Sequence, residues 1–100
     1  MKKVAFLFLL PWLLGFSCNQ VHTVGMQWQP SPTLGVEYKV YRSQVNGGPY
    51  SAIATGLTSM QYTDTVSSGT YYYVTTAYYP NCVGAHCESN YSDQIVAVVP

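Results

Sequence analysis

Charged residues are scarce in this sequence of 100 residues, which has four Lys or Arg and four Asp or Glu. Two of the basic residues, Lys2 and Lys3, lie at the N-terminus, so the rest of the chain offers only Lys39 and Arg42. Proteins that bind nucleic acid or an anionic membrane surface present clusters of basic side chains. Because the sequence has no such cluster, we expect no nucleic-acid partner.

Helical periodicity is also missing, because no window of helical length repeats apolar residues at intervals of three and four. The chain instead contains ten tyrosines together with many Val and Thr residues. These residue types favour the half-buried surfaces of β-sheets. The composition therefore predicts an all-β protein.

The N-terminal segment "MKKVAFLFLLPWLLGFSC" has the three parts of a secretory signal. Two lysines precede an apolar run from Val4 to Leu14, and small or polar residues follow. The run is shorter than the roughly 20 apolar residues that a bilayer-spanning helix needs. We predict a signal peptide at residues 1–17, a single domain at residues 18–100, and export to the periplasm, outer membrane, cell surface or medium.

The residues around Cys18, "LLGFSC", resemble the lipoprotein box of bacteria, in which a cysteine receives a diacylglycerol and becomes the mature N-terminus. The segment departs from that pattern, since the bulky Phe16 stands where a small residue is usual and the leucine lies one place too far away. Cys18 is therefore either the lipid anchor or a residue beside an ordinary cleavage site. Contact with a membrane is expected only through such an anchor.

The other two cysteines, Cys82 and Cys87, enclose four residues. In an exported protein this spacing favours a disulfide, which would stiffen the loop. The alternative is a zinc site formed by Cys82, His86 and Cys87, but a fourth ligand is not evident, since His22 lies on a distant strand, where we expect it at the surface. We favour the disulfide and expect no metal or cofactor.

From residue 21 onward the sequence reads as short strands separated by turns. The segments with strand character are "HTVGMQW", "VEYKVYR", "YSAIA", "MQYTDT", "TYYYVTTAYY" and "QIVAVV". The breaker "QPSPTLG", the turn "SQVNGGP" and the corner "VSSG" lie between them. Several short strands at this spacing predict an antiparallel β-sandwich.

The order and spacing of these segments over about residues 22–100 resemble a fibronectin type III domain, of the compact kind found in bacteria and phages. The resemblance implies that Trp28 is the core tryptophan on the second strand and that Tyr38 is a further signature aromatic residue. Tyr71 matches the tyrosine corner, whose hydroxyl bonds to backbone just upstream, near residues 66–68.

The same resemblance implies that Tyr71, Tyr73, Thr75 and Ala77 face the core. Thr75 is a departure from the family, in which an apolar β-branched residue is usual at this position. Its buried hydroxyl would need a hydrogen-bond partner or would lower stability.

The family has seven strands in an immunoglobulin-like pair of sheets, one of three strands and one of four. Here the second strand begins only a few residues after Cys18, so we expect the first strand to be missing or reduced to a stub from Cys18 to Val21. A missing first strand would leave an exposed sheet edge that invites strand addition or self-association.

No group of residues in the sequence has the pattern of a catalytic site, and the fold itself does not specify a function. We expect a non-enzymatic protein with two candidate binding surfaces. One is the loop from Pro80 to Asp93, which contains His86 and lies at the pole shared with the loop from Pro30 to Gly35. The other consists of tyrosines expected to point outward from the four-stranded sheet: Tyr41, Tyr50, Tyr72 and Tyr78.

Our leading hypothesis is a secreted or lipid-anchored module of the bacterial cell envelope that binds a protein or glycan, or spaces such binders. The alternative is a structural decoration module of a virion or fibre, although a signal peptide argues against it.

Overall fold

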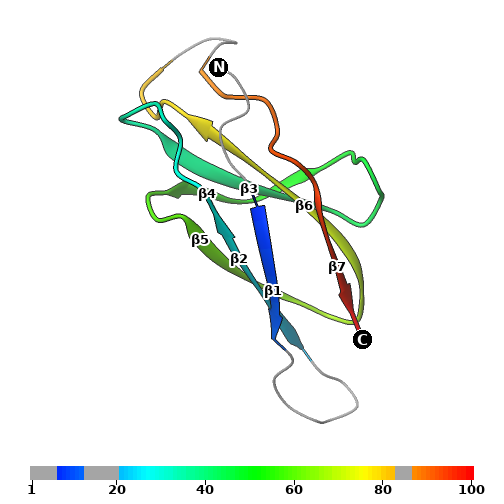
Figure 1. Cartoon of the computed structure of the whole chain (residues 1–100). Helices are drawn as coiled ribbons and strands as arrows, with labels where there is room; N and C mark the ends of the chain where they lie inside the picture. The colour runs from blue at the N-terminus through cyan, green and yellow to red at the C-terminus, as the bar shows by residue number, and fades with distance from the viewer. Residues whose placement is uncertain (1–6, 13–20, 83–86) are drawn as a thin grey trace.

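The computed structural model describes residues 7–12, 21–82 and 87–100, and forms a sandwich of two antiparallel sheets (Figure 1). The three-stranded sheet has the order β1-β2-β5 and the four-stranded sheet the order β4-β3-β6-β7. The strands are β1 (Leu7–Trp12), β2 (His22–Trp28), β3 (Glu37–Ser43), β4 (Ser51–Leu57), β5 (Gln61–Val66), β6 (Gly69–Tyr78) and β7 (Ile95–Val99). The predicted all-β class and the division into sheets of three and four strands are confirmed.

The turn between β3 and β4 forms where the sequence predicted it. Gly47 and Gly48 have φ angles of 83° and 93°, in the left-handed region that glycine adopts at little cost. The hairpin that follows pairs β3 with β4 and contains irregularities between Tyr38 and Tyr41. These glycines therefore allow the chain to reverse between two strands of the same sheet.

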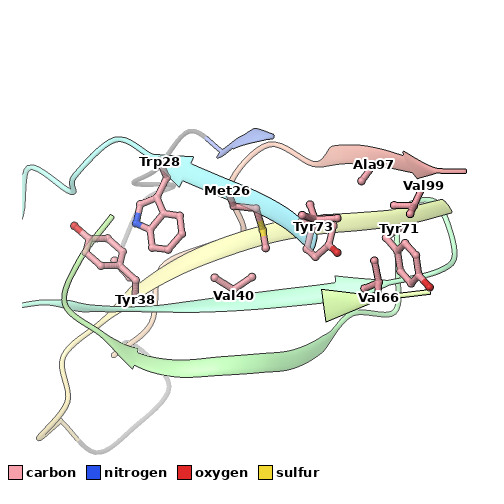
Figure 2. Close-up of a cluster of buried hydrophobic side chains, with 11 residues drawn as sticks. Met26, Trp28, Tyr38, Val40, Val66, Tyr71, Tyr73, Ala97 and Val99 are labelled. Carbon is pink, nitrogen blue, oxygen red and sulfur yellow. The ribbon is translucent and has the colours of Figure 1, made fainter. Parts of the chain in front are cut away.

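The core between the sheets is built from aromatic and β-branched side chains (Figure 2). Trp28 on β2 and Tyr38 on β3 are each 4% exposed, and their ring centroids lie 5.8 Å apart across the sandwich. All four β6 residues expected to face the core are buried: Tyr71, Tyr73, Thr75 and Ala77. The family signature positions thus occupy the places predicted for them.

Tyr71 forms the predicted tyrosine corner. Its hydroxyl donates a hydrogen bond of 3.0 Å to the carbonyl oxygen of Ser67, four residues upstream. The contact ties the start of β6 to the corner that follows β5, where the chain crosses from one sheet to the other.

The first strand lies earlier in the chain than we predicted. We expected it to be missing or to form a stub at residues 18–21, but Leu7–Trp12 pairs with β2 along the strand's entire length, from Trp28 back to Thr23. An apolar run of this length fits either a signal peptide or a buried strand, and sequence periodicity alone does not separate the two. In the full-length chain, part of the predicted signal segment therefore completes the three-stranded sheet.

His22 also differs from the prediction. We placed it on the surface of a strand, whereas it is only 6% exposed. It lies on β2 two residues before the fully buried Val24, and alternate residues of a strand share a face. The inward face of β2 thus begins with a histidine.

Candidate functional site

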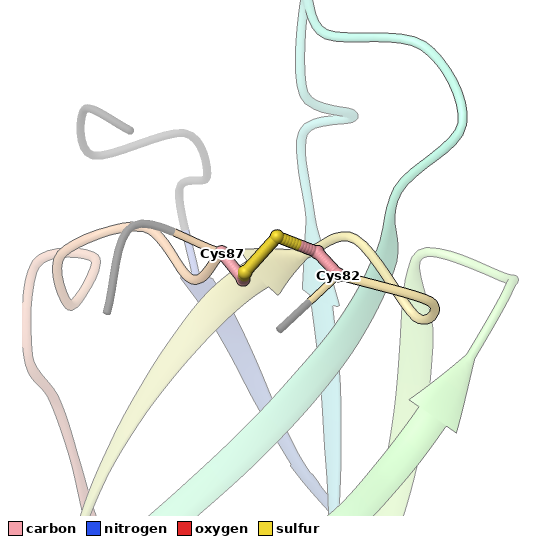
Figure 3. Close-up of a disulfide and its surroundings, with 2 residues drawn as sticks. All are labelled: Cys82 and Cys87. Carbon is pink, nitrogen blue, oxygen red and sulfur yellow. A yellow bond between two sulfur atoms is a disulfide. The ribbon is translucent and has the colours of Figure 1, made fainter. Parts of the chain in front are cut away.

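The loop after β6 is closed by a disulfide between Cys82 and Cys87, whose Cα atoms lie 5.7 Å apart (Figure 3). Next to it, the backbone N–H of Tyr79 donates a hydrogen bond of 3.0 Å to the carbonyl of Cys87. The predicted crosslink is therefore present at the pole of the sandwich. His86 and Cys18 lie outside the described residues, so their roles in binding and lipidation stay predictions.

Two serines hold the segment after the disulfide against β6. Ser89 N–H donates to the carbonyl of Ala77, and Ala77 N–H donates to the Ser89 hydroxyl, at 2.8 and 2.9 Å. Ser92 makes the same pair of hydrogen bonds with Thr75, also at 2.8 and 2.9 Å. In each pair, the serine hydroxyl accepts the hydrogen bond that a backbone carbonyl would accept in a regular β-ladder. These contacts fix the segment against β6, although the segment is not a regular strand.

Tyr91, which lies between these serines, joins two of the predicted surface tyrosines. Its ring packs edge-on against Tyr41 of β3, with centroids 5.2 Å apart, and against Tyr50, at 5.1 Å. Tyr91 is 45% exposed, whereas the other two rings are half-buried. The result is an aromatic cluster of three rings on the outer face of the four-stranded sheet.

The carboxylate of Glu88 lies beside this cluster and is held by three neighbours. Thr76 Oγ1 donates to Oε2 at 2.6 Å, the Tyr41 hydroxyl donates to the same oxygen, and Lys39 Nζ lies 3.3 Å from Oε1. Partial burial opposes ionisation of Glu88, but these hydrogen bonds and the lysine charge outweigh it and lower its pKa below the usual value.

The same contacts act on Tyr41 in the opposite direction. Burial, followed by the hydrogen bond to Glu88 and the charge of that carboxylate, raises the pKa of the Tyr41 hydroxyl. Glu88 therefore remains an anion and Tyr41 a neutral hydrogen-bond donor at neutral pH.

These side chains line a hollow of about 280 Å³, which we call the tyrosine hollow. Its lining residues are Tyr41, Thr76, Glu88, Ser89, Asn90 and Tyr91. It combines an exposed aromatic ring with a carboxylate and an amide. This arrangement can hold a ligand by ring stacking and hydrogen bonding.

The remaining predicted tyrosines do not line the hollow. The Tyr78 hydroxyl donates to Glu37 Oε1 at 3.1 Å and accepts from the Gly56 N–H at 2.9 Å, while Lys39 Nζ lies 4.6 Å from the centre of its ring. Tyr72 is half-buried and lies opposite Ser43 in the β3–β6 register. Of the four predicted surface tyrosines, only Tyr41 lines the hollow, and Tyr50 packs edge-on against Tyr91.

Sequence reasoning missed Glu88 and Tyr91 as members of the site. No local pattern marks these two residues, because Ser89 and Ser92 position the segment through contacts with β6 that are distant in the sequence. We had treated residues 80–93 as one loop, although its second half lies on the sheet.

A second and larger hollow, of about 580 Å³, opens between the sheets near the β3–β4 hairpin. Arg42 lines it, but its guanidinium is bound to the buried carboxylate of Asp64 at 2.8 Å. The Tyr73 hydroxyl donates to the same carboxylate, also at 2.8 Å. The charges of Arg42 and Asp64 at this hollow therefore form an ion pair between the two sheets.

Within residues 21–82 and 87–100, no three His, Cys, Asp or Glu side chains come close enough to hold a metal ion. The described ranges also contain no helix of the length and hydropathy needed to cross a membrane.

Comparison with solved structures gives the family. An Fn3-like protein from Clostridium thermocellum is 34% identical and superimposes with a TM-score of 0.64 over 89% of this chain and 84% of that one. The chain belongs to the fibronectin type III-like family. No protein-family model matches the sequence of this Fn3-like chain, and no curated protein matches it.

Two further structures share the fibronectin type III-like fold at lower identity. The fibronectin type-III domain of human fibronectin type III domain containing protein 3 is 17% identical, with a TM-score of 0.59 over 99% of this chain and 88% of that one. A beta-1,2-glucanase from Parabacteroides distasonis is 23% identical, with a TM-score of 0.59 over 89% of this chain. This chain spans only 13% of the glucanase.

Proposed function

We propose that this Fn3-like chain is an exported, non-enzymatic module of the cell envelope that binds a glycan in the tyrosine hollow. The observation that carries the proposal is the exposed ring of Tyr91 beside the Glu88 carboxylate and the Asn90 amide. A sugar presents an apolar ring face and several hydroxyl groups, so it needs an aromatic surface next to polar acceptors and donors.

The rigidity of the hollow favours binding. The disulfide, the two serines and the hydrogen bonds to Glu88 hold its walls in place before any ligand arrives. Less conformational entropy is lost on binding when the site is already ordered. The hollow is also small, which suits one or two sugar rings better than an extended protein surface.

A second candidate is a spacer that separates binding domains. It is favoured by the hydroxyls of Tyr41, Tyr50 and Tyr78, which are all engaged in internal hydrogen bonds. In a spacer these tyrosines would only stiffen the sheet, and Tyr91 would be dispensable.

Glycan binding separates the two candidates. The purified protein is applied to a glycan array and to isolated peptidoglycan, and binding is compared with that of Tyr91→Ala and Glu88→Gln. We expect both substitutions to weaken binding at least about tenfold, since each removes one of the few groups that contact the ligand. Tyr79→Ala is the matched control, because Tyr79 is 39% exposed and does not line the hollow.

If Tyr91→Ala binds the glycan as tightly as the wild type does, the glycan site lies outside the tyrosine hollow. No binding to any glycan would leave the spacer as the better account.

Export is tested by the mass of the N-terminal peptide of the protein recovered from its host. A mature chain beginning at Cys18 supports export, and added acyl mass on Cys18 supports anchoring to a membrane. A full-length chain with an intact leader would contradict both.

A further inference from the structure

The first strand of the sandwich coincides with the apolar part of the predicted signal peptide. β1 comprises Leu7–Trp12, within the run from Val4 to Leu14 that we assign to the leader. Cleavage before Cys18 would remove β1 and leave the outer edge of β2 without its hydrogen-bonding partner.

The register shows which backbone groups this cleavage would expose. Trp28 N–H donates to the Met60 carbonyl, on the side of β2 that faces β5. Backbone groups point to alternate sides along an antiparallel strand, so those of Gly25 and Gln27 face β1, where they lie opposite Leu10 and Phe8.

The proline in β1 fits this geometry. Pro11 lies opposite Val24, whose backbone groups point toward β5. The position at Pro11 therefore needs no N–H directed at β2, and proline is tolerated on the outer side of an edge strand. The missing N–H of Pro11 therefore costs no hydrogen bond to β2 in the observed register.

The position of β1 also restricts what can replace it. β1 lies alongside β7 and approaches β6 of the facing sheet, so it closes one side of the sandwich (Figure 1). A second copy of the chain could offer its own β2, but Val24 and Met26 of that strand are 0% and 1% exposed within their own core. A replacement must therefore bring apolar side chains that are not already buried elsewhere.

We propose that the processed chain binds an extended apolar segment of another exported protein along the edge of β2, antiparallel and in the register of β1. Backbone hydrogen bonds to Gly25 and Gln27 provide affinity, and apolar side chains that close the sandwich provide specificity. The inference rests on the proposed export and is independent of glycan binding in the tyrosine hollow.

The test uses the chain processed by its own host and recovered from the envelope. Amide hydrogen exchange is measured by NMR with and without a probe peptide, the sequence of residues 5–12 with lysines added at both ends for solubility. We expect the peptide to bind in a 1:1 complex and to slow exchange at Gly25 and Gln27 at least about tenfold. Exchange at Val24 and Met26, whose N–H groups face β5, should change far less.

Two variant peptides serve as matched controls. Phe8→Pro removes an N–H directed at Gln27 and should abolish protection, whereas Leu9→Pro removes an N–H directed away from β2 and should retain it. Equal binding of the two variants would contradict the proposed register.

The remaining outcomes are also decisive. If the processed chain is unfolded alone, recovery of β-sheet circular dichroism on adding the peptide supports the proposal, and no recovery overturns it. A processed chain that forms a homodimer with Gly25 and Gln27 already protected overturns it as well. Recovery of a chain that keeps residues 1–17 would contradict the proposed export. A cleaved chain that does not bind the peptide would contradict only this inference.

Discussion

Arg42 on β3 and Asp64 on β5 form an ion pair across the two sheets, with 2.8 Å between Nη1 and Oδ2. Asp64 is 6% exposed and also accepts a hydrogen bond from the Tyr73 hydroxyl. Removing one partner of a buried pair leaves the other charge without compensation. We therefore expect Asp64→Ala to lower the free energy of unfolding by roughly 2–4 kcal/mol, less than for a fully buried pair because Arg42 is partly exposed.

The control replaces all three polar partners with apolar residues, as Arg42→Met, Asp64→Leu and Tyr73→Phe together. Denaturant unfolding should show this triple variant to be more stable than Asp64→Ala, since no uncompensated charge remains. A triple variant as unstable as the single one would mean that the network contributes more than charge compensation.

The buried hydroxyl of Thr75 should lower the stability of the folded chain, and a single substitution can measure this effect. The residue is 0% exposed, and its hydroxyl has no hydrogen-bond partner among the described residues. Thr75→Val keeps the shape and removes the unsatisfied group, so we expect it to raise the free energy of unfolding by about 1 kcal/mol.

The neighbouring Thr76 is the matched control. It is 1% exposed, but its hydroxyl donates to Glu88. Thr76→Val should therefore lower the free energy of unfolding by about 1–2 kcal/mol. Urea unfolding curves of the two variants should shift in opposite directions, and a shift in the same direction would contradict the account.

The tyrosine corner gives a similar pair of variants. Tyr71→Phe removes the hydrogen bond to the Ser67 carbonyl and should lower the free energy of unfolding by about 1 kcal/mol. Tyr72→Phe changes a half-buried ring on the opposite face of β6 and should have a much smaller effect. Thermal unfolding of both variants tests the difference, which would vanish if the corner contributed nothing.

Glu88 should make stability depend on pH in the acid range. Because the pKa of Glu88 is lower in the folded chain than in the unfolded one, the unfolded state binds more protons between the two values. The stabilisation is complete above the unfolded pKa, about 4.3, and is lost as the pH falls through the folded value. Glu88→Gln should remove this part of the pH dependence, as measured by urea unfolding from pH 2 to pH 7.

Strand positions could be predicted from local patterns, because alternation and turn residues mark where each strand begins and ends. Trp28 and Tyr71 lie in the core where the resemblance to the fibronectin type III family places them, and Cys82 and Cys87 are close enough in sequence to determine their own pairing. The location of β1 could not be predicted, because an apolar run carries the same pattern in a leader and in a strand.

The tyrosine hollow could be predicted only in part. Outward-facing tyrosines follow from strand alternation, which placed Tyr41 correctly. Tyr91 is positioned by the hydrogen bonds of Ser89 and Ser92 to β6, and such long-range contacts leave little trace in local sequence. Glu88 was missed for the same reason, since its partners Lys39 and Tyr41 are nearly 50 residues away.

The spacing of Ser89 and Ser92 has a consequence for how the protein can change over generations. Ser89 forms hydrogen bonds with Ala77 of β6, and Ser92 forms them with Thr75. Inserting or deleting one residue between the two serines would break one of these pairs of hydrogen bonds. It would also displace the ring of Tyr91 from the rings of Tyr41 and Tyr50. Insertions and deletions among descendants of this sequence should therefore be absent between Ser89 and Ser92.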